Sequence, residues 1–130
     1  MLKSAVSLIH QYTKEAETFQ RTLAFVAEEN TGLKNRLERI LQNISHEDRA
    51  ILERIEYFQD GFLKIDEINR FLRGEVASQN RLLIQEGYED GDLMKEVKRS
   101  QKKLRKNIQD SEKEFNNLKF EFHDYLQEIL

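Results

Sequence analysis

An apolar stripe that recurs about every 3.5 residues is the feature that most constrains this chain. In the C-terminal third it follows alternating spacings of four and three residues through Val97, Gln101, Leu104, Ile108, Ser111, Phe115, Leu118, Phe122, Tyr125 and Ile129. An α-helix presents such positions along one side, whereas a strand requires alternation every two residues. The pattern therefore predicts a helix over residues 93–130, with the short side chain of Asp92 as its N-cap.

The middle third carries a stripe with the same spacing. It passes through Ile51, Ile55, Phe58, Phe62, Ile65, Asn69, Leu72, Val76, Gln79 and Leu83. Ser45 and Asp48 are spaced nearly as in a capping box at its start, and Gly87 suits the residue after a helix end. These signals predict a second helix over residues 46–86.

The first third is less regular. One stripe keeps the spacing through Phe19, Leu23, Val26, Asn30, Leu33, Leu37, Ile40 and Ile44, and an earlier one through Leu2, Val6, Ile9, Thr13 and Ala16. The two are joined by a step of three residues where four is due, which is a stammer in a heptad pattern. Because the later stripe holds its phase across residues 30–32, we predict one helix over residues 2–43; the alternative is a break there, which would give four helices.

The two connections, at residues 43–45 and 87–91, are short. Short connections place consecutive helices side by side and antiparallel, and heptad stripes pack at shallow crossing angles. The absence of proline and the presence of only 5 glycines argue against a turn-rich sandwich or barrel. The predicted fold class is therefore all-α, with residues 1–130 forming a single domain, an elongated antiparallel up-down-up three-helix bundle with coiled-coil-like packing.

The sequence offers no residues for chemistry. It has no cysteine, hence no disulfide, thiol nucleophile or cysteine-ligated metal. A di-iron site in a helical bundle needs a carboxylate three residues from a histidine, and His10, His46 and His123 have none three or four residues away. Glycine-rich phosphate loops are also missing. We therefore predict a protein that is not an enzyme, with no catalytic residues, no metal and no cofactor.

Hydropathy and charge bear on location. No apolar run approaches the ~18 residues of a membrane span, and the first thirteen residues lack the continuous apolar core of a signal peptide. Basic and acidic residues nearly balance, with a formal net charge of −3. These properties predict a cytoplasmic protein without a membrane span.

Large apolar side chains occur at positions that point away from the stripes of their own helices. These partner-binding candidates are Phe25, Tyr57, Phe71 and Phe120. Exposed apolar residues often mark association surfaces, so they favour docking to a protein partner or to a second copy of the chain. The alternative is a wide core that buries them.

A second surface feature is a basic run with a single acid, Glu96. Its members are Lys95, Lys98, Arg99, Lys102, Lys103, Arg105 and Lys106. Such a basic face can hold phosphates, as in nucleic acid, with strong salt dependence. Otherwise it is a solvated face, paired with acids of the middle helix such as Glu75 and Glu86.

Polar residues interrupt the apolar stripes at Asn30, Asn69, Gln79, Gln101 and Ser111. They predict either a seam whose register is set by polar contacts or one that is partly wet. The leading hypothesis is a non-catalytic helical interaction or assembly module that associates with itself. The alternative is a polyanion-binding helical protein that uses the basic face at residues 95–106.

Overall fold

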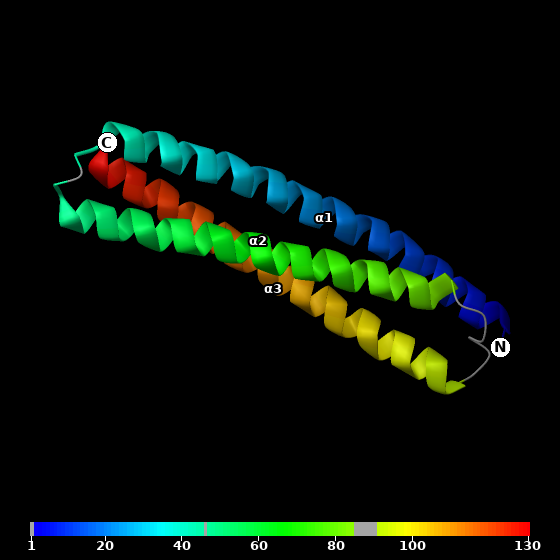
Figure 1. Cartoon of the computed structure of the whole chain (residues 1–130). Helices are drawn as coiled ribbons and strands as arrows, with labels where there is room; N and C mark the ends of the chain where they lie inside the picture. The colour runs from blue at the N-terminus through cyan, green and yellow to red at the C-terminus, as the bar shows by residue number, and fades with distance from the viewer. Residues whose placement is uncertain (1, 46, 85–90) are drawn as a thin grey trace.

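The computed structural model describes residues 2–45, 47–84 and 91–130. Its elements are three α-helices, α1 (Leu2–Asn43), α2 (Arg49–Ile84) and α3 (Gly91–Ile129), with no strand among these residues. The helices lie side by side along their length, and α2 runs antiparallel to the other two (Figure 1). The predicted all-α three-helix bundle is confirmed.

The first helix is continuous through residues 30–32, so the four-helix alternative is wrong. Asn30 lies fully inside the bundle, and the Thr31 hydroxyl donates a hydrogen bond back to the carbonyl of Ala27 at 3.0 Å. A threonine bonded to its own preceding turn does not cap a new helix. Gly32 is exposed and keeps the helical path.

The predicted stammer in α1 is also wrong. Val6 is 52% exposed and Thr13 is exposed, so neither belongs to the seam. The buried and half-buried positions that lead to Phe19 are instead Ala5, Ile9, Tyr12 and Ala16. These have the regular spacing of four and three, so α1 keeps one heptad phase, with the half-buried Ala5 and Tyr12 in place of two β-branched residues.

The helix ends differ slightly from the predicted ones. The second helix begins at Arg49, because the carboxylate of Asp48 accepts a hydrogen bond from the amide of Ile51 at 3.2 Å and so acts as the N-cap predicted for Ser45. The third begins at Gly91, which places Asp92 inside its first turn. Gly87, the predicted end of the second helix, lies outside the described residues.

The core divides into an aromatic part and an aliphatic part. The aromatic part joins Phe58, Phe62, Phe122 and Tyr125, with ring centroids 5.1 Å apart for Phe58 and Phe122 and 5.2 Å apart for Phe62 and Phe122. The second part is aliphatic except for Phe19, and its residues are Ala16, Phe19, Leu23, Leu72, Val76, Leu104 and Ile108. Every one of these side chains belongs to a heptad stripe, which explains why the stripes face one another.

Four of the polar seam residues are buried and bonded across helices. Asn69 donates to the carbonyl of Leu23 at 2.8 Å, and Asn30 donates to the carbonyl of Phe62 at 2.9 Å. Gln79 of α2 donates to the side-chain oxygen of Gln101 of α3, while Ser111 is half-buried and bonds within its own helix. Because each amide donates to specific acceptors on a neighbouring helix, a shift of register would leave it unpaired.

We predict that Gly74→Ala will stabilise the bundle by about 1 kcal/mol, since glycine costs that much relative to alanine inside a helix. A Cβ at Gly74 meets no heavy atom within 4 Å, whereas one at Gly61 would lie 3.0 Å from both methyl groups of Leu118. Urea unfolding followed by circular dichroism should therefore rank Gly74→Ala above Gly61→Ala. The reverse order would contradict the close approach of α2 and α3 at Gly61.

Candidate interaction surfaces

Polar contacts define two flanks of α3. On one flank Glu121 faces α2: its Oε2 accepts a hydrogen bond from the Tyr57 hydroxyl at 3.0 Å, and its Oε1 lies 3.7 Å from the guanidinium of Arg54. On the other flank α3 faces α1, where Arg105 pairs with Glu15. Lys119 pairs with Glu29 on that same flank at 3.4 Å. The surface positions of α3 can therefore be assigned to one flank or the other.

The structure leaves all four outward aromatic residues exposed. The exposed fractions are 59% for Phe25, 45% for Tyr57, 63% for Phe71 and 60% for Phe120. The wide-core alternative is therefore wrong for these side chains. They come from three different helices, and no ring contact joins any two of them within the described chain.

Two of these aromatic residues share one side of α2. Tyr57 and Phe71 are fourteen residues apart, which is two heptads, so both project from the same side of the helix. The Tyr57 hydroxyl reaches α3 through Glu121, so this is the side of α2 that borders α3. Phe25 belongs to α1, so the structure does not gather all four into one patch.

The basic run splits into a paired and an unpaired part. Arg105 is half-buried, and its Nε and Nη2 donate to the two carboxylate oxygens of Glu15 at 2.6 and 2.8 Å. Lys106 pairs with Asp110 one turn along α3 at 3.3 Å. The other five side chains are exposed and make no ion pair with a described residue: Lys95, Lys98, Arg99, Lys102 and Lys103.

Among the described residues, no acid of the middle helix pairs with the basic run. Glu75 forms no ion pair with a described residue, and Glu86 lies outside the described part of the chain. The acid of another helix that pairs with the run is Glu15 of the first helix. Sequence reasoning missed it because Glu15 and Arg105 are ninety positions apart, and only the packing of α1 beside α3 brings them together.

Glu15 is the centre of a polar network that links all three helices. Besides Arg105, its carboxylate accepts a hydrogen bond from Gln101 Nε2 at 2.7 Å. The side-chain Oε1 of Gln101 accepts a hydrogen bond from Gln79 Nε2 at 3.1 Å. The same nitrogen also donates to the backbone carbonyl of Val97 at 3.1 Å. The two buried glutamines of the seam are therefore bonded to each other, to the backbone of α3 and to this ion pair.

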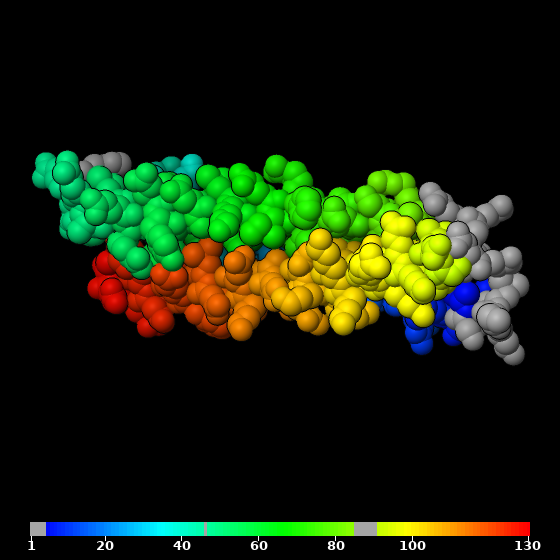
Figure 2. Space-filling view, turned by 90° about the horizontal axis from the view of Figure 1, so that it is seen from below, coloured from blue at the N-terminus to red at the C-terminus, as the bar shows by residue number. Residues whose placement is uncertain are grey.

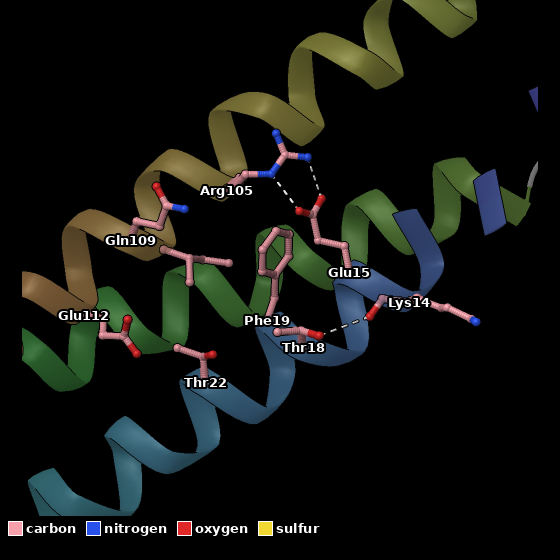
Figure 3. A pocket seen from close by; sticks show the side chains of 9 residues that line it. Lys14, Glu15, Thr18, Phe19, Thr22, Arg105, Gln109 and Glu112 are labelled. Carbon is pink, nitrogen blue, oxygen red and sulfur yellow. Dashed lines mark hydrogen bonds and ion pairs between the residues drawn. The ribbon is translucent and has the colours of Figure 1, made fainter. Parts of the chain in front are cut away.

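The network borders an open groove of about 460 Å³ between α1 and α3, where Glu15 points toward Arg105 above the ring of Phe19 (Figure 3). The remaining lining residues are Lys14, Thr18, Thr22, Ile108, Gln109 and Glu112. Glu15 and Arg105, the ion pair that lines this groove, bond to each other. In the described parts of the chain no three histidine, aspartate or glutamate side chains converge as metal ligands.

The ion pair changes the titration of both partners. The hydrogen bond from Arg105 is the largest cause that lowers the pKa of Glu15; burial opposes this shift, and the bond from Gln101 adds to it. The same hydrogen bond raises the pKa of Arg105. On the other flank of α3, acceptance by Glu121 raises the pKa of the Tyr57 hydroxyl, because the bond favours its protonated form.

We predict that Glu15→Gln will destabilise the bundle at neutral pH but not in acid. The folded-state pKa of Glu15 is lowered, so its contribution is fully present above the unfolded-state pKa and is lost as the pH falls through the folded-state pKa. Urea unfolding at neutral and acidic pH should show the two proteins converging in acid. Glu17→Gln, which removes the same charge from an exposed position, should have little effect at either pH.

Comparison of the chain with protein-family models, with curated proteins and with solved structures finds no match. Within the described residues, none of the helices combines the length and the hydropathy that crossing a membrane requires. The surfaces themselves are therefore the basis for assigning a role.

Proposed function

We propose that this protein is a non-catalytic helical module that associates with a second copy of itself through apolar side chains on the outside of the bundle. The observation that carries the proposal is the exposure of four large aromatic residues, from 45% to 63%, beside a core that the stripe residues already fill. Full burial of such a side chain contributes about 1.5–3 kcal/mol, so covering several of them supplies a driving force for association.

The placement of Tyr57 and Phe71 supports a contact along the rod. Fourteen residues of helix separate them by about 21 Å on one side of α2. Aromatic side chains are enriched in protein interfaces relative to other surfaces. A second elongated bundle laid along this side can contact both residues at once.

The test is a dilution series by sedimentation velocity on the full chain. We expect the wild type to move from dimer to monomer in the micromolar range, and the variant Phe25→Ser, Tyr57→Ser, Phe71→Ser, Phe120→Ser to remain monomeric. Circular dichroism should show unchanged helicity, since these positions lie outside the core. A wild type that stays monomeric at every concentration would overturn the proposal.

The alternative role is polyanion binding. It is favoured by one observation, the five exposed basic side chains of α3 that have no ion pair within the described chain. Titration of a labelled oligonucleotide should then show binding at low salt that weakens steeply as salt rises. The variant Lys98→Glu, Lys102→Glu, Lys103→Glu should abolish it while Arg105 still holds Glu15, and absence of binding at low salt rejects this role.

A further inference from the structure

Charge is divided along the length of α3. Residues 91–106 carry seven basic and two acidic side chains, whereas residues 107–129 carry two basic and six acidic ones. The second helix repeats the division in the opposite chain direction, with three basic and one acidic side chain in residues 70–84 and three basic and five acidic in residues 49–69. Because α2 is antiparallel to α3, these divisions coincide in space.

Contacts between the helices show the coincidence directly. The start of α3 lies beside the end of α2, where Gln79 bonds to the carbonyl of Val97. The end of α3 lies beside the start of α2, where Tyr57 bonds to Glu121. The first helix adds little, with two basic and two acidic side chains in residues 2–20.

The bundle is therefore a rod with a basic half and an acidic half. Residues 2–20, 70–84 and 91–106, which form the basic half, hold twelve basic and five acidic side chains, a net charge of +7. The rest of the described chain holds nine and sixteen, a net charge of −7. The sequence between α2 and α3, residues 85–90, contains three more acids; counting them with the basic half leaves a net of +4.

Building on the self-association proposed above, we propose that the second copy lies antiparallel across the face made by α2 and α3, so that the basic half of each α3 contacts the acidic half of the other. Figure 2 shows this face, along which both helices run from end to end. A two-fold axis at the boundary between the basic and acidic halves, near Phe71, would bring the Phe71 side chains of the two copies close together and would cover Tyr57 with the basic half of the second copy.

Charge complementarity selects this arrangement. A parallel pair would place like charges together along the whole rod, which is unfavourable. An end-to-end contact would also join opposite charges, but it would leave Tyr57 and Phe71 uncovered and would continue into filaments. The antiparallel pair satisfies both the charges and the aromatic residues, and each contact occurs twice.

Heptad spacing identifies the charges on this face. Glu114 lies seven residues before Glu121, so it shares the flank of α3 that borders α2. Asp124 lies one turn beyond Glu121, and Lys103 lies three heptads before Asp124 on the same side. Arg99, one turn before Lys103, has the outward heptad position of Phe120, at the border of this face. All of these but Glu121 are exposed.

A matched pair of positions lies on the opposite flank. Lys98 is one heptad before Arg105, which faces Glu15 of α1, and Lys102 is one turn beyond Lys98. Both are exposed and lie in the same basic half of α3. They allow the same change of net charge to be made away from the proposed contact.

The test is a charge swap measured by sedimentation velocity on full-length chains. Arg99→Glu, Lys103→Glu makes both halves of the face acidic, and Glu114→Lys, Asp124→Lys makes both basic, so each variant alone should dimerise at least about tenfold more weakly than the wild type. An equimolar mixture of the two variants should form a heterodimer with affinity near the wild-type value. The control Lys98→Glu, Lys102→Glu should dimerise as the wild type does.

Salt gives an independent readout. Raising the ionic strength from about 0.05 to 0.5 M should weaken the wild-type dimer, whereas a parallel dimer would be strengthened by screening of like charges. The antiparallel arrangement would be overturned if the control variant dimerised as weakly as Arg99→Glu, Lys103→Glu. It would also be overturned if the two charge-swap variants did not associate when mixed. Self-association itself would still stand if the wild type dimerises and the aromatic variant does not; a monomeric wild type rejects both.

Discussion

Replacing Phe62 with alanine should lower the free energy of unfolding by about 3–5 kcal/mol, the largest effect expected from a single substitution in this chain. Phe62 has no exposed surface, and its ring lies 5.2 Å from that of Phe122 and 6.3 Å from that of Phe58. Truncation removes apolar burial and leaves a cavity that helices fixed along their whole length cannot close. Urea unfolding followed by circular dichroism measures the loss.

The matched control is Phe120→Ala. Phe120 is 60% exposed, so its truncation should change stability by no more than about 0.5 kcal/mol. The measurement should be made at a protein concentration where both variants are monomeric, since Phe120 belongs to the proposed association surface. Equal losses for the two variants would refute the placement of the aromatic core.

Asn69→Asp should produce the second large effect, a loss of about 3 kcal/mol or more at neutral pH. Asn69 is 6% exposed, and its Nδ2 donates to the carbonyl oxygen of Leu23. Aspartate has nearly the same shape, but it removes the donor and places a carboxylate against that oxygen. The substitution therefore buries a charge without a partner.

The pH dependence of this variant has a definite sign. Burial raises the folded-state pKa of the introduced carboxyl group above its unfolded-state value, so the folded state holds the proton more tightly. The stability deficit should therefore shrink as the pH falls toward the unfolded-state pKa, where the protonated group can again donate to the Leu23 carbonyl. Urea unfolding over a pH series measures this recovery.

Asn69→Leu serves as the control. It removes the same hydrogen bond but adds no charge, so its effect should be smaller than that of Asn69→Asp and independent of pH in this respect. Equal deficits for the two variants at every pH would show that residue 69 is not held in a dry seam.

The outward positions of the candidate surface were predictable from helical phase. Phe25, Tyr57, Phe71 and Phe120 lie away from their stripes, and each is exposed. Their distribution was not predictable, because phase places a residue on a side of its own helix and carries no information about the neighbouring helix. Contacts between the helices, such as the hydrogen bond of Tyr57 to Glu121, identify which side of α2 borders α3.

The N-terminal part of α1 shows the same limit on a smaller scale. Val6 and Thr13 suggested a stammer, yet the helix turns Ala5 and Tyr12, both half-buried, toward the bundle instead. Both interpretations fit the residue types, since all four types occur both inside proteins and at their surfaces. The continuous path of α1 from the core at Phe19 decides between them.

The sequence by itself determined that the chain forms three long helices and, except in the N-terminal part of α1, which side of each is buried, because a fixed rotation per residue turns heptad spacing into a stripe. The tertiary structure alone decided which charges meet. Glu15 pairs with Arg105, and the basic parts of α2 and α3 lie at the same end of the rod. Both follow from the axial offset between the helices, which their packing sets. Local periodicity does not contain that offset, and the proposed antiparallel association depends on it.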